Sequence, residues 1–288
     1  MKTDDILQRY MDLPKFMYLL QNSSLFLPKM SIFDDHLEGG LTAKNYLSSS
    51  NDGAILDVAL NCFAPATNET SEERSKRLEL GETVSKEIKQ RIFETPFGIY
   101  KRNDLDELFP RCREFIYVSC WHKSSHECSA MWSLYGGDNN SVCIFTTEEK
   151  LRTQTADNGN KLNEIKLEDV KYIDHKSDTL SCNKLEPFLA KSLPFSFEKE
   201  ARLIAYDPTL NLNSAVINEA NGKKLTIRSL PELIDKVVIS PKADAWFADS
   251  VKQLCDSKGI NVVTKSTLRT ERVVSFFSAL EQLQETGL

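Results

Sequence analysis

Two carboxylates and an arginine alternate in the segment 197–206, as Glu198, Glu200 and Arg202. In an extended strand alternate side chains share a face, so these three charges are expected to project together. Such a row of charges is typical either of a solvated strand edge or of the floor of a polar site. Paired carboxylates at a site can stabilise a developing oxocarbenium ion or hold divalent cations.

A second group of candidate residues lies in the predicted helix 127–135, which begins with Glu127 and carries Trp132 and Tyr135. An acidic residue at a helix start interacts favourably with the helix dipole, and the aromatic side chains could belong to a core. The same three residues could instead line a nucleotide-sized pocket. Both interpretations stay open.

A third group is the acidic loop 34–40, which contains Asp34, Asp35, His36 and Glu38 and follows a short predicted strand. Loops at this place often bind ligands. The alternative is a plain turn in which the aspartates cap the next helix.

Four possible zinc ligands are close in sequence: Cys120, His122, His126 and Cys128. Structural zinc sites usually draw two ligand pairs from separated parts of the chain, so this spacing favours thiols and loop histidines without a metal. The sequence contains neither a P-loop nor a Rossmann glycine pattern. Nucleotide hydrolysis by a P-loop and hydride transfer on a Rossmann domain are therefore disfavoured.

The predicted elements form a mixed α+β fold with small, mainly antiparallel sheets. Strands are expected at 25–27, 115–121, 142–145, 165–173, 197–206 and 224–228, and helices at 13–20, 71–93, 127–135 and 185–193. The C-terminal part predicts a strand–helix–strand unit from 236 to 263. A polar helical insertion is expected at about 42–111, within one domain that spans 1–288.

Composition limits the cellular context. The chain has 288 residues, a net charge of −6 and 41% hydrophobic residues, which argues against nucleic-acid binding through overall charge. No apolar run is long enough for a membrane span, and the N-terminus is unlike a signal peptide. Seven cysteines without framework spacing suit a reducing compartment. We expect a cytoplasmic protein with no membrane partner.

Taken in order, several segments resemble the bacterial domain of unknown function 2971, from about residue 9 to about residue 265. The segments that carry the resemblance are 9–11, 25–27, 33–39, 117–121, 127–136, 197–204 and 239–243. Asp34 and His36 stand where the family usually has Asn and Pro, and Cys128 stands where Ser is usual. These departures further disfavour zinc. The resemblance implies a phage-defence or toxin-like context, in which a phage-derived trigger is a possible partner.

The layout also resembles a divergent ADP-ribosyltransferase, which implies NAD as substrate and a nucleic acid or protein as acceptor. This resemblance implies that Glu200 is the catalytic carboxylate and that Glu198 orients the acceptor. It also implies that Arg9 binds the pyrophosphate of NAD. The catalytic residues that we expect on this basis are Glu200, Glu198, Arg9 and Glu127. The expected NAD-binding residues are Arg9, Tyr10, Ser119, Trp121, Trp132, Tyr135, Asp35, Glu38 and Arg202.

Two other functions remain open. In a metal-dependent nuclease or phosphodiesterase, Mg²⁺ ions would be held by the carboxylates Asp34, Asp35, Glu38, Glu127, Glu198 and Glu200. In a non-enzymatic defence sensor or interaction protein, the helical region 42–111 would be the partner surface.

Overall fold

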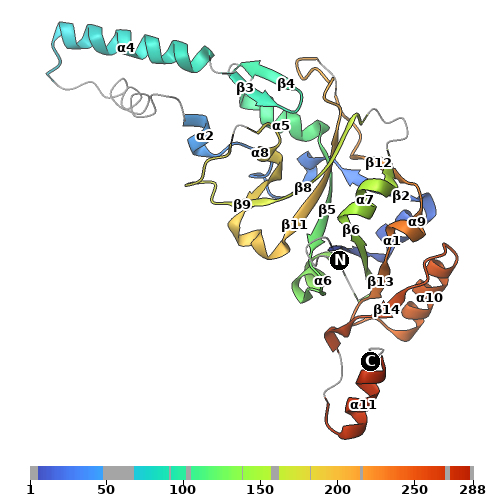
Figure 1. The fold of residues 1–288 in the computed structure, drawn as a ribbon. Helices are drawn as coiled ribbons and strands as arrows, with labels where there is room; N and C mark the ends of the chain where they lie inside the picture. Colours follow the sequence, from blue (N-terminus) through green and yellow to red (C-terminus); the bar gives the residue numbers. More distant parts are fainter. Residues whose placement is uncertain are drawn as a thin grey trace. The chain divides into compact units, whose positions relative to one another are not determined.

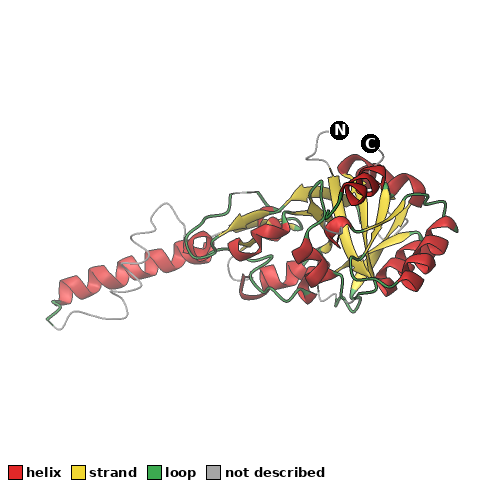
Figure 2. Ribbon diagram, turned by 90° about the horizontal axis from the view of Figure 1, so that it is seen from below, coloured by secondary structure: helices red, strands yellow, loops and turns green. Residues whose placement is uncertain are grey.

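The computed structural model describes residues 6–47, 68–90, 92–101, 105–137, 139–156, 162–181, 183–214, 217–269 and 273–285. Its internal contacts divide the chain into two compact units, which are described separately. The first unit comprises Met1–Asn22, Ser124–Lys150 and Ser229–Leu288. The second unit comprises Ser23–Lys123 and Leu151–Arg228. The chain contains both helices and strands (Figure 2), and most strand pairs are antiparallel, so the predicted mixed α+β class is confirmed.

The first unit contains four strands whose pairing runs β1–β6–β13–β14. Their bounds are β1 (Ile6–Asp12), β6 (Ser141–Thr147), β13 (Lys236–Ile239) and β14 (Val263–Lys265). The first two pairs are antiparallel, and the last is parallel. Its helices are α1 (Leu13–Asn22), α6 (Ser129–Tyr135), α9 (Leu230–Leu233), α10 (Ala245–Asp256), α11 (Phe276–Glu285) and the 3-10 turn η5 (Thr267–Arg269).

The predicted C-terminal strand–helix–strand unit is confirmed as β13, α10 and β14 (Figure 1). Buried residues of α10 recur at helical spacing (Phe247, Val251 and Cys255). The helix ends near Gly259, whose φ of 74° favours glycine. The second strand begins at Val263, the last residue of the predicted unit.

The second unit contains three neighbouring strands in the order β5–β11–β8, all antiparallel (Figure 1). Their bounds are β5 (Tyr117–Lys123), β11 (Glu200–Tyr206) and β8 (Glu164–Asp169). All seven residues of β11 are buried. The solvated-edge interpretation of the segment 197–206 is therefore wrong, because β11 pairs with a strand on each side.

Smaller sheets and helices complete the second unit. The sheets are β2 (Ser24–Pro28) with β12 (Gly222–Ile227) and β7 (Thr155–Ala156), the parallel pair β9 (Lys171–Ile173) and β10 (Ala190–Ser192), and the hairpin β3 (Ile92–Thr95) and β4 (Gly98–Lys101). The helices are α2 (Ala43–Leu47), α4 (Ser71–Gln90), α5 (Leu105–Phe115), α8 (Glu186–Leu189) and the 3-10 turns η2 (Met30–Ile32) and η4 (Leu193–Glu198). Helix α7 (Glu148–Gln154) connects β6 to β7 along the chain.

The predicted helical insertion is only partly helical. Helices α2 and α4 and the start of α5 agree with the prediction, whereas the hairpin β3–β4 contradicts it. Pro96 and Gly98, with φ of 120° at the glycine, explain the turn between these strands. Residues 48–67 of the predicted insertion lie outside the described part of the chain.

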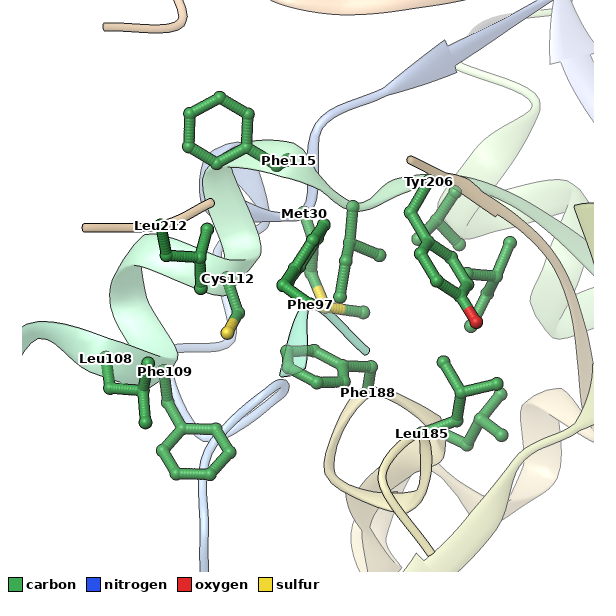
Figure 3. Packing of buried hydrophobic residues seen from close by; sticks show 14 of the residues in the cluster. Met30, Phe97, Leu108, Phe109, Cys112, Phe115, Leu185, Phe188, Tyr206 and Leu212 are labelled. Carbon is green, nitrogen blue, oxygen red and sulfur yellow. The ribbon is translucent and has the colours of Figure 1, made fainter. Parts of the chain in front are cut away.

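The end of this region belongs to the core of the second unit. Phe97 packs edge-to-face on Tyr206 of β11, with ring centroids 5.9 Å apart. Phe109 of α5 lies beside Phe188, at 6.3 Å between ring centroids (Figure 3). These aromatic contacts fix the end of α5, which carries an arginine of the candidate site. In the described ranges no helix combines the length and apolarity needed to span a bilayer.

Candidate functional site

Five charged side chains of the second unit form one buried group, which we call the ion cluster. Its members are Glu38, Lys191, Glu198, Glu200 and Arg202, none of them more than 7% exposed. Charged residues are rarely buried unless they are paired. Three carboxylates face only two cations, so one negative charge is in excess when every member is ionised.

Strand alternation explains why Glu200 and Arg202 share a face, as the sequence predicts. On the neighbouring strand β5 their Cα partners are His122 and Cys120, so these four side chains lie on one face of the sheet. The predicted strand is wrong at its start, because Glu198 ends the 3-10 turn η4. Lys199 then adopts a left-handed φ of 41° before the strand begins.

Arg202 is the fully buried centre of the cluster. Its Nε donates to Glu200 Oε1 at 2.8 Å, and its Nη2 donates to Glu200 Oε2 at 3.2 Å and to Glu38 Oε2. The remaining Nη1 donates to the carbonyl of Phe188 at 2.9 Å. This fork-like geometry orients Glu200 and satisfies the guanidinium in the absence of bulk water.

Lys191 is the second cation, and it bridges the carboxylates. Its Nζ lies 2.6 Å from Glu198 Oε2, 3.2 Å from Glu200 Oε2 and 3.6 Å from Glu38 Oε1. The sequence interpretation missed this residue because it predicted a helix over 185–193. Only α8 is helical there, and Lys191 is the middle residue of β10. Pro194 restricts only Leu193, the residue before it, so no local signal placed Lys191 in a strand.

A clamped loop presents Glu38 to the cluster. The Arg113 guanidinium donates long hydrogen bonds of 3.3–3.4 Å to the backbone carbonyls of the loop residues Met30, Phe33, Asp35 and His36. The Gly39 N–H donates to the carbonyl of Pro187 at 3.0 Å. The sequence did not predict a role for Arg113, because this residue belongs to no recognisable motif.

Gly39→Ala is expected to destabilise the protein by roughly 1–2 kcal/mol, because φ at this position is +79°. A Cβ there would also lie 2.8 Å from Arg113 Cγ. The matched control is Gly40→Ala, whose added Cβ has its nearest neighbour, the Leu37 carbonyl oxygen, at 3.6 Å. Urea denaturation of both variants measures the difference, and equal stabilities would show that the loop does not need glycine at 39.

The electrostatics of the cluster hold Glu200 ionised. Burial on its own raises the pKa of the Glu200 carboxyl, but Arg202 and Lys191 outweigh it and lower that pKa to about 2. Glu38 differs: burial raises its pKa, and attraction to Arg202 and Lys191 offsets this only in part. For both cations burial lowers the pKa, but the carboxylates outweigh it, so the pKa values of Lys191 and Arg202 are raised. Of these two carboxyls, Glu38 therefore takes up a proton more readily than Glu200.

Three polar residues border the cluster. The Tyr172 hydroxyl accepts a hydrogen bond from the Glu200 N–H at 2.8 Å, and burial raises its pKa to about 12. His122 Nδ1 is hydrogen-bonded to the Glu198 carbonyl. Burial, followed by the nearby Glu200 carboxylate, raises the pKa of the Cys120 thiol. These contacts fix the backbone on both sides of Lys199.

The other expected site residues of the second unit are not members of the ion cluster. Ser119 and Trp121 alternate with Cys120 and His122 on β5, so they lie on the opposite face of the sheet. Asp35 uses Oδ1 to accept from the Leu37 N–H at 2.9 Å, as the plain-turn alternative predicts. Only Glu38 of the acidic loop joins Glu198, Glu200 and Arg202.

Glu127 belongs to the first unit and links segments far apart in sequence. Its Oε2 accepts from Trp132 Nε1 at 3.0 Å and from Ser266 Oγ, and its Oε1 accepts from the Thr267 N–H at 3.0 Å. The helix begins two residues later than predicted, at Ser129. Through these hydrogen bonds the Glu127 carboxylate connects α6 with the segment that leads into η5.

The aromatic residues of the first unit are partly core residues. Tyr10 and Trp132 pack edge-to-face with ring centroids 4.9 Å apart, and both are buried. The Tyr10 hydroxyl also accepts from the Cys128 N–H at 2.8 Å. Tyr135 is 42% exposed. Arg9 alternates with Tyr10 on β1, so its side chain lies on the other face of that strand.

The four possible zinc ligands are divided between the units. Cys120 and His122 belong to the second unit, and His126 and Cys128 belong to the first. Among the described residues, no three His, Cys, Asp or Glu side chains are arranged to hold a metal ion. Cys120, Cys128 and the other cysteines that the structure describes are free thiols.

Comparisons with known proteins add no family assignment. No family model matches the chain, and neither the curated proteins nor the solved structures give a significant match. The resemblances to domain 2971 and to ADP-ribosyltransferases therefore rest on the sequence segments quoted above. The ion cluster is the feature from which a function can be argued.

Proposed function

We propose that the protein is an enzyme that consumes NAD by breaking the bond between nicotinamide and ribose, with the ion cluster as its catalytic centre. One observation carries this proposal: three buried carboxylates face two cations. The excess negative charge lies in a region of low dielectric, where it interacts strongly with a cation.

The chemistry of NAD fits an excess of negative charge. When the glycosidic bond breaks, its electron pair leaves with nicotinamide, and the positive charge passes from the pyridinium ring to the ribose as an oxocarbenium ion. A fixed, ionised carboxylate stabilises that charge without reorganising. Water or another nucleophile then bonds to the ribose and loses a proton.

The cluster residues have distinct roles in this proposal. Glu200 is the charge-stabilising carboxylate, because Arg202 and Lys191 orient it and keep it ionised. Glu198 also accepts a hydrogen bond from Lys191. In this proposal Glu198 orients the incoming nucleophile. We assign no catalytic role to Glu127, whose oxygens already accept hydrogen bonds within the first unit. Binding of NAD by Arg9, Tyr10, Ser119, Trp121, Trp132 and Tyr135 stays a prediction.

The experiment is to measure nicotinamide release from NAD by the wild type and by Glu200→Gln. We expect the rate to fall by roughly 10²–10³-fold, the usual effect of removing one preorganised electrostatic group. Glu168→Gln is the matched control, because Glu168 is the exposed β8 neighbour of Arg202. It should leave the rate unchanged. Circular dichroism must show that each variant is folded at the assay temperature.

Two results would contradict the proposal: wild-type protein that releases no nicotinamide, or a folded Glu200→Gln variant with an unchanged rate. The second result would leave the cluster a purely structural role. It would favour the non-enzymatic sensor or interaction protein. The same proposal includes an acceptor, which is water, a protein or a nucleic acid. It also includes a role as a defence or toxin effector. Both rest on the sequence resemblances.

A metal-dependent nuclease is less well supported by these contacts. In the ion cluster, Lys191 and Arg202 already bind the carboxylates that would hold Mg²⁺. A cation of higher charge would have to displace both. No contact among the described residues favours this second function over the first.

A further inference from the structure

We propose that helix α11 is a docking surface for a second copy of this chain, and that two such helices pair antiparallel in a dimer. The surface, which we call the α11 face, consists of exposed apolar side chains within and just before the helix: Val273, Val274, Phe276, Phe277 and Leu280. This part of the chain belongs to the first unit, whereas the ion cluster belongs to the second. The inference is therefore independent of NAD turnover.

The α11 face is turned to solvent. Phe276 and Phe277 are 75% and 74% exposed, and their rings contact each other edge-to-face with centroids 6.2 Å apart. The less exposed side of the helix carries Ser278 and Ala279, which are half-buried. A surface helix normally has the opposite orientation, with its apolar side buried and its polar side exposed. A group of large apolar side chains that face solvent together is typical of an interaction surface.

The length and spacing of α11 favour another helix as the partner. The helix has ten residues, and its start is capped by Ser275, whose Oγ accepts from the Ser278 N–H at 3.2 Å. Isolated helices shorter than about 12–15 residues are marginal in water, because most helical stability comes from packing of an amphipathic face. Apolar residues recur at 273, 276, 277 and 280, the spacing by which one helix packs on another.

Charge complementarity selects a second copy as that partner. Residues 265–272, just before the helix, carry three basic side chains and one acidic side chain, a net charge of +2. Residues 273–288 carry two acidic side chains and no basic one, a net charge of −2. In an antiparallel pair the basic segment of each copy lies beside the acidic end of the other, and two-fold symmetry makes this contact twice. The helix dipoles also favour the antiparallel arrangement.

The same charges disfavour a membrane surface as the partner. Helices that lie in a membrane interface usually carry Lys or Arg on their polar face, and anionic headgroups attract these cations. The charged residues in the sequence of α11 are Glu281 and Glu285. An anionic bilayer would repel them. The α11 face therefore fits the apolar side chains of a second copy better than it fits anionic lipid.

The first test is sedimentation velocity of the full chain over a series of protein concentrations. Wild type is expected to dimerise with a dissociation constant of roughly 1–100 μM, because a pair of short helices makes a small interface. Phe276→Asp should weaken dimerisation at least roughly tenfold, since it places a charge in the centre of the contact. Ile217→Asp is the matched control, because Ile217 is 82% exposed and belongs to the second unit. It should dimerise as wild type does.

The second test exchanges the charges at the two ends. Glu281→Lys with Glu285→Lys makes both ends basic, and Arg269→Glu with Arg272→Glu makes both ends acidic. Each double variant alone should be monomeric at concentrations at which wild type dimerises, because like charges then meet at both ends. An equal mixture of the two should form dimers again. High salt should weaken the wild-type dimer and the mixed dimer, since these charges are screened.

Three results would overturn the inference: wild type that is monomeric at millimolar concentration, a Phe276→Asp variant that dimerises as wild type does, or a mixture of the charge variants that stays monomeric. Circular dichroism shows whether each variant is folded. If a variant fails to fold, the concentration series and salt dependence of wild type decide the matter. Monomeric wild type that co-sediments with phosphatidylglycerol vesicles would overturn the choice of partner in favour of a membrane surface.

Discussion

Arg202→Met is expected to lower the free energy of unfolding by roughly 3–5 kcal/mol, because removing one partner of a buried ion pair leaves the other partner uncompensated. Here the loss would leave three buried carboxylates with Lys191 as the only cation of the cluster. Typical domains are stable by about 5–15 kcal/mol, so the variant should be close to unfolding. Urea denaturation followed by tryptophan fluorescence measures the change.

Lys123→Met is the control for this prediction. Lys123 pairs with Asp169 at 3.0 Å, but the two side chains are 26% and 64% exposed. An exposed ion pair contributes about 0–1 kcal/mol. If Arg202→Met is no more destabilising than Lys123→Met, the buried network does not stabilise the fold.

Acid is expected to remove roughly 3 kcal/mol of stability that comes from Glu200 alone. The pKa of this carboxyl is lowered from 4.5 to about 2 in the folded state, and each pKa unit corresponds to about 1.36 kcal/mol. A lowered pKa stabilises the fold above the pKa of the unfolded chain, and the stabilisation is lost as pH falls. The stabilisation by Glu200 is therefore expected to disappear between about pH 5 and about pH 2.

The measurement compares wild type with Glu200→Gln by urea denaturation at pH values from 7 to 2. The difference between them should be largest at neutral pH and should shrink as wild-type Glu200 takes up its proton. Glu38→Gln should show the opposite sign: the raised pKa of Glu38 costs stability as pH rises through it. A difference between wild type and Glu200→Gln that does not change with pH would contradict the assignment.

Local sequence patterns predicted the parts of the fold that depend on local rules. The alternation of Glu200 and Arg202 placed both on one face because β11 is a regular strand. The C-terminal strand–helix–strand unit followed from its apolar runs, separated by a helix with a buried stripe. The predicted end of the helix at Tyr135 is confirmed for α6, which is followed by Gly136 and by Gly137 with φ of 74°.

The site residues that sequence analysis missed depend on tertiary contacts. Lys191 is a strand residue only because β10 pairs with β9, and this parallel pairing carries no local signal. Arg113 acts on a loop some 80 positions earlier in the chain. Ser119 and Trp121, which are expected to bind NAD, lie on the face of β5 opposite Cys120 and His122, and their binding of NAD stays a prediction. A strand pleat divides neighbouring residues between two faces, so order along the chain does not give proximity.

The pairing of Glu38 with Arg202 also bears on how the protein folds. These residues are 164 positions apart, and closing so long a loop has an entropic cost that few early contacts can offset. The pair is therefore expected to form after the folding transition state. Interactions made so late mainly slow unfolding and have little effect on the folding rate. We therefore expect the ion cluster to slow unfolding of the second unit. Its main effect would be a longer lifetime of the folded state.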